Sequence, residues 1–231
     1  MTPEMIDMLN TLIKEIEKTH DGSGGVGAND LIPGTVLCDD ALLNELVFSM
    51  LLWESSFEHA KKAAGRISEE LVDLNELRVC TGDELALIMG ARMPRGGERA
   101  RRLLRVLNEI YDRENTLSLS VFSEMSKREV QEYLEGIDGL PRFVSARVIL
   151  LGLDWHAFPL DERLAKLLGS KNIITASEAL NHQAAQLERG VRASDSLRTY
   201  TLIEHWAQNQ RGSSRSPKPR GGKKTTKGVS S

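Results

Sequence analysis

The chain has 231 residues, of which 40% are hydrophobic and 27% charged, a balance typical of a folded protein with one large or two small domains. No apolar run reaches about 18 residues, so we expect no membrane span. Two cysteines, Cys38 and Cys80, are too few for a disulfide framework or for an all-cysteine iron–sulfur cluster. The N-terminal residues lack the pattern of a secretory signal, and the sequence therefore predicts a cytoplasmic protein.

The net charge of −3 is the sum of a strongly acidic N-terminal region and a strongly basic C-terminal region. Residues 211–231 carry seven Lys and Arg residues and no acid, whereas residues 1–45 carry nine acids and two lysines. The 211–231 segment has almost no apolar side chains, which predicts a disordered basic tail. Such a tail is either an electrostatic arm for a polyanion or a solubilising terminus without a specific partner.

Apolar residues recur at helical spacing along most of the chain, which predicts an all-α protein. We expect an amphipathic helix near the N-terminus, with an apolar face formed by Met5, Met8, Leu9, Leu12, Ile13 and Ile16. A glycine-rich stretch at 20–34 reads as a linker, because no phosphate-binding lysine follows it. Residues 41–53 are almost entirely apolar and predict a central helix. Ser55 or Ser56 is expected to cap the next helix, which extends to about residue 72.

Two capping boxes predict further helix starts, one at Thr81 with Glu84 and one at Ser126 with Glu129. A long helix is expected over 98–111, and the only candidate strand is 117–122. The predicted organisation is an N-terminal helix and loop over 1–38, a helical domain over 39–210, and the tail over 211–231.

Residues 130–168 contain the most informative pattern. A helix that starts at Ser126 should end near Gly136, and a second helix should run from about 142 to 151. The turn between them holds Gly139, which can adopt a positive φ, and Pro141, which fixes φ for a helix start. The free amides at the second helix's start could bind a phosphate. Asp161 then stands at the N-cap of a third helix, over 162–168.

This pattern resembles the helix-hairpin-helix (HhH-GPD) superfamily of DNA glycosylases, the endonuclease III-like group. The hairpin residues 137–145 (IDGLPRFVS) correspond to the family's L-P-G-V-G-R-K-T-A, and 160–163 (LDER) to its V-D-T-H element. The helix end at 51–56 (LLWESS) and the stretch 98–103 (ERARRL) also resemble family segments. The resemblance covers about residues 40–208. It implies a two-lobed helical fold and base excision from a flipped nucleotide in duplex DNA.

The departures from the family pattern shape the expected chemistry. Phe143 stands 18 residues before Asp161, where bifunctional members carry a lysine that attacks the sugar. Lyase activity is therefore not expected. Pro141 replaces a hairpin glycine and removes one amide donor, and Ser55 stands near the family's glutamine. The cysteines of the family's iron–sulfur cluster are absent, so we expect no cofactor and no metal.

The resemblance nominates Asp161 as the carboxylate that stabilises the cationic sugar and orients water in a monofunctional enzyme. The local sequence alone favours an ordinary helix cap for Asp161, and the resemblance brings the two interpretations level. Trp53, Glu54 and Phe57 are the candidates to line the base pocket.

Six arginines within 14 residues predict a polyanion-binding helix face, unless they form an ordinary solvated face: Arg92, Arg95, Arg99, Arg101, Arg102 and Arg105. The residues expected to bind DNA are Arg99, Arg102, Gly139, Leu140, Arg142, Phe143, Arg147, Lys223 and Lys224. We expect a monomer that binds double-stranded DNA. Two alternatives remain open: a glycosylase-fold DNA-binding protein without catalysis, and a helical interaction protein with a nonspecific basic tail.

Overall fold

The computed structural model describes residues 1–20, 31 and 34–210. The predicted basic tail, including Lys223 and Lys224, and most of the glycine-rich stretch lie outside these residues. The described part of the chain is helical and contains no β-strand. In those same residues, no helix combines the length and the hydropathy needed to cross a membrane.

The described residues form eleven α-helices. In chain order they are α1 (Pro3–His20), α2 (Ala41–Leu52), α3 (Phe57–Glu70), α4 (Leu74–Val79), α5 (Gly82–Met89), α6 (Gly96–Glu114), α7 (Lys127–Glu135), α8 (Arg142–Arg147), α9 (Glu162–Ser170), α10 (Leu180–Gly190) and α11 (Ser196–Gln210). A π-helical turn, η3 (Val148–Gly152), continues α8, and two 3₁₀ turns, η2 (Ser120–Ser123) and η4 (Ala193–Asp195), connect other helices.

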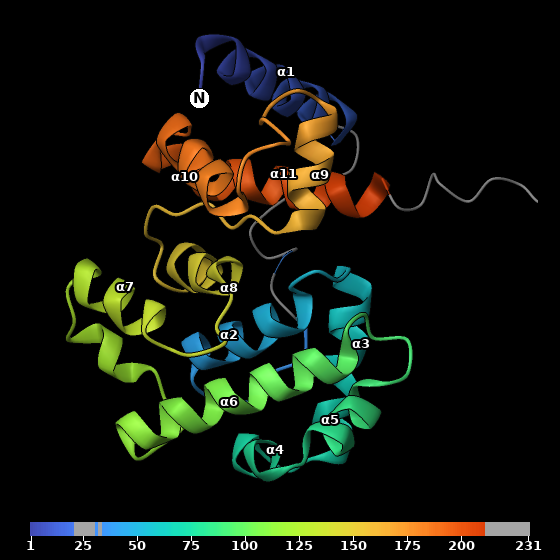
Figure 1. Ribbon diagram of the computed structural model, residues 1–231, viewed down its shortest axis with the longest axis vertical. Helices are drawn as coiled ribbons and strands as arrows, with labels where there is room; N and C mark the ends of the chain where they lie inside the picture. The colour runs from blue at the N-terminus through green and yellow to red at the C-terminus, as the bar shows by residue number, and fades with distance from the viewer. Residues whose placement is uncertain (21–30, 32–33, 211–231) are drawn as a thin grey trace, which may run out of the picture.

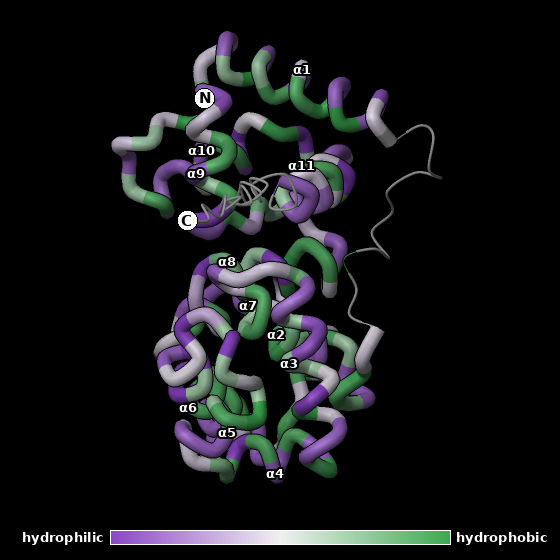
Figure 2. The backbone as a smooth tube through the Cα atoms, turned by 90° about the vertical axis from the view of Figure 1, so that its right-hand side faces the viewer, coloured by the Kyte–Doolittle hydropathy of each residue, from purple (hydrophilic) through white to green (hydrophobic). Residues whose placement is uncertain are grey.

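The helices form two lobes with separate hydrophobic cores, as predicted (Figures 1 and 2). One core belongs to α2–α7, and the other to α1 and α9–α11. Helix α8 lies between the lobes in Figure 1 and contributes to both cores: Phe143 and Val144 pack into the first, and Ala146 into the second. The segment that joins the lobes is therefore the second helix of the predicted hairpin.

The predicted helix starts are confirmed. Both capping boxes form, and Ser56 caps α3. The apolar face of α1 is confirmed at Leu9, Leu12 and Ile16, which are buried against the second core, although Met8 is 42% exposed. The N-terminal helix thus packs within the second lobe, next to α11.

The predicted strand at 117–122 is wrong. The segment forms an irregular stretch followed by η2, and its two buried residues, Leu119 and Phe122, are three positions apart instead of the two that a strand face requires. Its polar groups are satisfied by a side chain instead of a neighbouring strand: Asp40 Oδ2 accepts from Ser118 Oγ at 2.6 Å and from the Leu119 amide at 2.7 Å.

Asp40 also caps α2, the central helix of the first lobe. Its Oδ1 accepts from the amides of Leu42 and Leu43, each at 3.0 Å. Burial alone would raise the pKa of Asp40, but the four hydrogen bonds outweigh it and lower the pKa below its ordinary value. One carboxylate therefore fixes both the start of α2 and the 118–119 segment.

We expect Asp40→Ala to lower the free energy of unfolding by about 2 kcal/mol at neutral pH, because a helix cap and two tertiary hydrogen bonds are lost together. A lowered folded-state pKa stabilises the fold above the unfolded pKa, about 3.9, and this gain is lost as the pH falls through the folded value. The difference from wild type in urea unfolding should therefore shrink below about pH 4. Asp39→Ala, at an exposed neighbour, is the control; an equal loss there would contradict the assignment.

Candidate functional site

The hairpin between α7 and α8 has the predicted turn geometry. Gly139 has a φ of +83°, a value that its lack of a side chain permits. Pro141, with φ −68°, occupies the N-cap position of α8, and no side chain caps this helix. The Val144 and Ser145 amides both donate to the Pro141 carbonyl, so the amides of Arg142 and Phe143 are the ones left for a ligand or solvent.

Helix α6 holds the hairpin in this shape. Glu109 Oε2 accepts from the Asp138 amide at 2.8 Å, and Arg105 forms an ion pair of 2.8 Å with the Asp138 carboxylate. Arg113 donates to the Gly136 carbonyl at 2.7 Å. The turn is thus set by contacts from a neighbouring helix as well as by its own glycine and proline.

A surface hollow of about 520 Å³ lies where α6 meets the hairpin turn. Its lining residues are Glu98, Arg101, Arg102, Arg105, Asp138, Gly139 and Leu140. Three guanidinium groups and the glycine turn therefore share one concave surface. Glu98 and Asp138 offset part of that positive charge, through ion pairs with Arg102 at 2.9 Å and with Arg105.

Three arginines surround the ring of Trp53, at the end of α2: Arg95, which precedes α6, and Arg99 and Arg102 on α6. The guanidinium carbons lie 5.7 Å (Arg95), 5.8 Å (Arg99) and 4.8 Å (Arg102) from the ring centroid. Arg95 lies outside α6 with φ +52°, so only Arg99 and Arg102 share a helical face, and this face points partly inward. Trp53 is only 9% exposed, so Arg102 would have to move before a base could stack on the ring face that it covers.

Arg99 is not a DNA-binding residue, contrary to the prediction. Its side chain is fully buried and donates to the carbonyls of Met50 and Pro94. Burial lowers its pKa to about 10, so it remains charged at neutral pH. Arg99 instead ties the last turn of α2 to the loop before α6.

Arg147 and Phe143 are also buried, which makes the prediction that they contact DNA wrong. Arg147 Nε donates to Glu45 at 3.0 Å and to Ser49 at 2.9 Å, and Arg147 Nη1 donates to the Tyr200 hydroxyl at 2.7 Å. Burial opposes its charge, but Glu45, Tyr200 and Glu204 together outweigh this effect and raise the pKa of Arg147. Phe143 is 2% exposed and packs in the first core.

Arg142 and Leu140 remain accessible on the hairpin: the Arg142 side chain is 44% exposed, and Leu140 is half-buried. The Arg142 guanidinium reaches α10, where it lies 3.3 Å from the Glu188 carboxylate. Leu140 lines the hollow beside α6. Among the predicted DNA contacts in the described residues, Gly139, Leu140 and Arg102 are therefore the ones that the structure brings together.

Asp161 caps α9 as predicted, but it does not open into a cleft. Its Oδ1 accepts from the Leu164 amide at 2.8 Å, and its Oδ2 accepts from the Glu54 amide at 3.2 Å and from Arg163 Nε at 3.4 Å. The side chain has no exposed surface. Burial raises the pKa of the Asp161 carboxyl, and Arg163 opposes this rise. This burial counts against the catalytic role that the resemblance assigns to Asp161, because that role requires the carboxylate to reach a flipped nucleotide.

Glu54 covers the same helix terminus from the turn between α2 and α3. Its Oε1 accepts from the Glu162 amide at 2.8 Å, while its own amide donates to Asp161. We call these two reciprocal bonds the Glu54–Asp161 clip. Glu54 has a φ of +52°, a conformation that costs a non-glycine residue about 1–2 kcal/mol. Burial, and then the charge of Asp161, raise the pKa of Glu54, which is only half-buried.

The predicted base pocket of Trp53, Glu54 and Phe57 is not an open pocket. Trp53 is covered by arginines, and Phe57 packs edge-on against Phe48 with ring centroids 5.3 Å apart. Glu54 is the one of these three residues whose amide donates a hydrogen bond to Asp161.

The sequence analysis did not foresee the buried ions around Asp161. Arg163 forms a bidentate pair with Glu204 on α11, at 2.7 and 2.9 Å. Arg147 in turn contacts Glu45 on α2 and Tyr200 on α11. We call this set of buried side chains the interlobe ionic network: Asp161, Arg163, Glu204, Tyr200, Arg147 and Glu45. In the sequence, this network is indicated by a charged residue within an otherwise apolar helix, such as Glu45 in 41–52.

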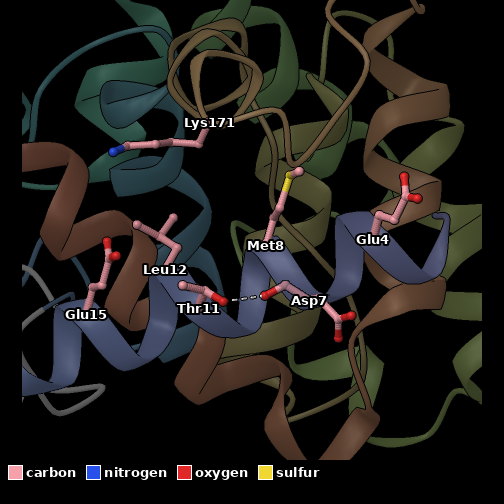
Figure 3. A pocket seen from close by; sticks show the side chains of 7 residues that line it. All are labelled: Glu4, Asp7, Met8, Thr11, Leu12, Glu15 and Lys171. Atoms are coloured by element: carbon pink, nitrogen blue, oxygen red, sulfur yellow. Dashed lines mark hydrogen bonds between the residues drawn. The ribbon is translucent and has the colours of Figure 1, made fainter.

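Other surfaces are less suited to DNA or metals. A hollow of about 440 Å³ on α1 exposes Glu4, Asp7 and Glu15 beside Lys171 (Figure 3). Its carboxylates would repel phosphates. Within the described ranges, no group of three or more His, Cys, Asp or Glu side chains could hold a metal ion.

Comparison with known proteins supports the fold assignment. No protein-family model and no curated protein matches the sequence. Solved structures do match. An endonuclease III–DNA covalent intermediate aligns with a TM-score of 0.62 at 10% identity, over 87% of this chain and 85% of that chain. The H. pylori 3-methyladenine DNA glycosylase bound to 1,N6-ethenoadenine aligns with 0.63 at 14% identity, over 89% and 98%.

A third neighbour is the Clostridium acetobutylicum 8-oxoguanine glycosylase/lyase in complex with double-stranded DNA. It aligns with a TM-score of 0.61 at 17% identity, over 90% of this chain and 70% of that chain. The chain therefore has the all-α fold of the endonuclease III-like helix-hairpin-helix DNA glycosylases. At these identities the likeness shows the fold alone.

We expect Arg99→Ala to lower the free energy of unfolding by about 3 kcal/mol, because it leaves two carbonyls without donors and a cavity beside Trp53. Chemical denaturation with circular dichroism measures the change. Arg101→Ala, at an exposed arginine of the same helix, should stay within about 0.5 kcal/mol of wild type. Equal effects of the two substitutions would show that Arg99 is not a structural residue.

Proposed function

We propose that this protein binds duplex DNA and removes a base by hydrolysis, as a monofunctional DNA N-glycosylase. The observation that carries the proposal is the hollow shared by the Gly139 turn and three α6 arginines. A glycine turn and an uncapped helix start favour a backbone phosphate, and guanidinium groups can contact its neighbours. The fold is also that of solved DNA glycosylases.

Contacts link this hollow to the two carboxylates. Arg102 lines the hollow and lies over Trp53; Glu54 follows Trp53 and binds the start of α9 beside Asp161. Cleavage of the glycosidic bond builds positive charge on the sugar, which a nearby carboxylate stabilises. Direct contact with Asp161 requires a rearrangement around the start of α9, because both carboxylate oxygens accept hydrogen bonds within the protein and the side chain is fully buried.

Hydrolysis without a lyase step fits the residue at position 143. Phe143 offers no amine, and its side chain is part of the core. Water would therefore attack C1′ while the base leaves with the bonding electrons, which yields a free base and an abasic sugar.

A second candidate is a DNA-binding protein that retains the glycosylase fold without catalysis. It is favoured by the complete burial of Asp161, whose two oxygens both accept hydrogen bonds within the protein. In that case Asp161 serves only to cap α9 and join the lobes.

Base release from a panel of lesion duplexes separates the two candidates. We expect wild type to generate sites that break only after alkali treatment, and we expect Asp161→Asn to lower the rate at least 100-fold. Asparagine still caps a helix, so a thermal melt should show that the variant is folded. The control is Asp154→Asn, at an exposed residue with φ +53°, which asparagine tolerates. Duplex binding without base release from any lesion would favour the second candidate.

DNA binding through the hollow has its own test, the dependence of affinity on salt. Each phosphate contact contributes about −0.9 to the slope of log K against log salt. We expect Arg101→Gln to reduce the slope by about 1 in fluorescence anisotropy with a labelled duplex. Arg128→Gln, on the exposed face of α7, should leave it unchanged. A slope that changes only when residues 211–231, with Lys223 and Lys224, are removed would place binding in the tail and favour the helical interaction protein.

A further inference from the structure

We infer that a pocket beside the hairpin binds a neutral nucleobase, stacked on Trp155. The inference rests on the DNA binding proposed above and adds a further recognition site to it. The pocket has a volume of about 530 Å³ and lies where α7, α8 and α10 meet, between the two lobes (Figure 1). This volume is within the range of ligand-binding pockets, about 300–1,000 Å³. None of Trp53, Glu54 and Asp161 lines it, so it is separate from the region of the carboxylates.

Hydrogen bonds to the main chain fix two rings in the wall of this pocket. The loop after η3 turns at Asp154, with φ +53°, and the Trp155 amide donates to the Ile149 carbonyl at 3.0 Å. His156 Nε2 lies 2.8 Å from the Glu188 carbonyl, and because a carbonyl only accepts, Nε2 carries the hydrogen. His156 Nδ1 is then an acceptor, and it has no hydrogen-bond partner among the described residues. Neither contact uses a ring face, so both rings are in place before a ligand binds.

One face of the Trp155 ring is covered by a lysine. Lys127, the first residue of α7, places its ammonium nitrogen 5.3 Å from the ring centroid, and its side chain is exposed. An exposed lysine can leave the ring because water then solvates its ammonium group. A planar base can take its place on the ring, as bases do on the aromatic side chains of proteins that bind single strands.

The charges of the pocket favour a ligand without net charge. Two cations, Lys127 and Arg142, are balanced by two carboxylates, Glu135 and Glu188. The hollow between α6 and the hairpin turn instead has three arginines and two carboxylates. A phosphate is therefore attracted more strongly to the hollow, and the pocket suits the neutral base of a nucleotide.

The other walls also suit a heterocycle. Leu134, Ala146 and Ala157 are buried apolar residues of the lining, whereas Gln131 and Asn181 are exposed amides. Apolar walls with a few polar groups are typical of sites for small planar ligands. A side-chain amide has both a donor and an acceptor, which match the edge of a base.

Leu140 connects the pocket to the proposed DNA-binding surface. This residue follows Gly139 in the hairpin turn and lines both the pocket and the hollow. A strand with a phosphate at the Gly139 turn therefore passes the mouth of the pocket. A paired base stays within the duplex, but an unpaired base can turn outward and stack on an aromatic ring. An unpaired base next to that phosphate is therefore the ligand that the pocket fits.

The test uses 2-aminopurine, a neutral base whose fluorescence is quenched by stacking. We expect a duplex with one bulged 2-aminopurine to bind about tenfold more tightly than the fully paired duplex, with quenching, because of the added stacking contact. Trp155→Leu should abolish the preference and the quenching but leave the affinity for the paired duplex unchanged. Asn181→Ala, at an exposed residue, should reduce the preference about threefold, and it serves as the test if Trp155→Leu does not fold.

Tyr111→Leu is the matched control. Tyr111 is also a partly exposed ring beneath a cation, with the Arg78 guanidinium carbon 3.7 Å from its centroid, but it lies outside the pocket. This variant should keep the wild-type preference for the bulge, and thermal melts should show that each variant is folded.

Free 2-aminopurine deoxyriboside distinguishes the source of the base. Saturable quenching of this nucleoside that requires Trp155, without a preference for the bulge, would support the pocket but assign it to a free nucleoside. The absence of any effect of Trp155→Leu and Asn181→Ala with either probe would overturn the inference. A wild-type protein that binds no duplex would overturn the proposed function, whereas the nucleoside would still test the pocket.

Discussion

The interlobe ionic network is the interaction on which the geometry of the site depends. It joins α2, α8, α9 and α11 through ions that are almost completely buried: Glu45, Arg147, Arg163, Glu204 and Asp161. Such pairs add little net stability, because desolvation offsets much of their attraction. They penalise strongly any packing in which a charge loses its partner. The network therefore specifies how the two lobes meet, and the start of α9 lies at that junction.

Asp161 belongs to this network and to the candidate site at once. As a helix cap and a partner of Arg163, it would be retained for structure alone. The same contacts hold a negative charge in a region of low dielectric, where its field on a nearby cation is strong. A structural role and a role in stabilising a nearby cation therefore both require an aspartate at position 161. The presence of Asp161 cannot by itself distinguish an enzyme from a binding protein, and only a readout of chemistry can.

The sequence predicted those features that depend on local chemistry. Helix caps, the amphipathic face of α1, the central apolar helix and the positive φ of Gly139 follow from residue type and spacing, and each is confirmed. The two-lobed fold was predicted from the resemblance of the hairpin and of the Asp161 element. The burial of Arg99 and Arg147 could not be predicted in this way. An arginine inside a helix looks the same in sequence whether it faces a phosphate or a carbonyl, and its direction depends on contacts as distant as that from Arg147 to Tyr200.

The strand error at 117–122 has the same origin. Alternating apolar residues satisfied the strand pattern, but the backbone partner turned out to be the Asp40 side chain, 79 residues away from Leu119.

The loss of the amine at position 143 is connected to the packing of the hairpin. Phe143 fills the first core at the point where α8 passes between the lobes. A lysine placed there would have to bury its stem and bring its ammonium group out of the core, at the expense of the contacts that hold α8. Reintroducing an amine would thus disturb the helix whose Arg147 positions α2 and α11. In the proposed glycosylase, the chemistry is accordingly that of the carboxylates at the start of α9, of which Asp161 is fully buried and Glu54 half-buried.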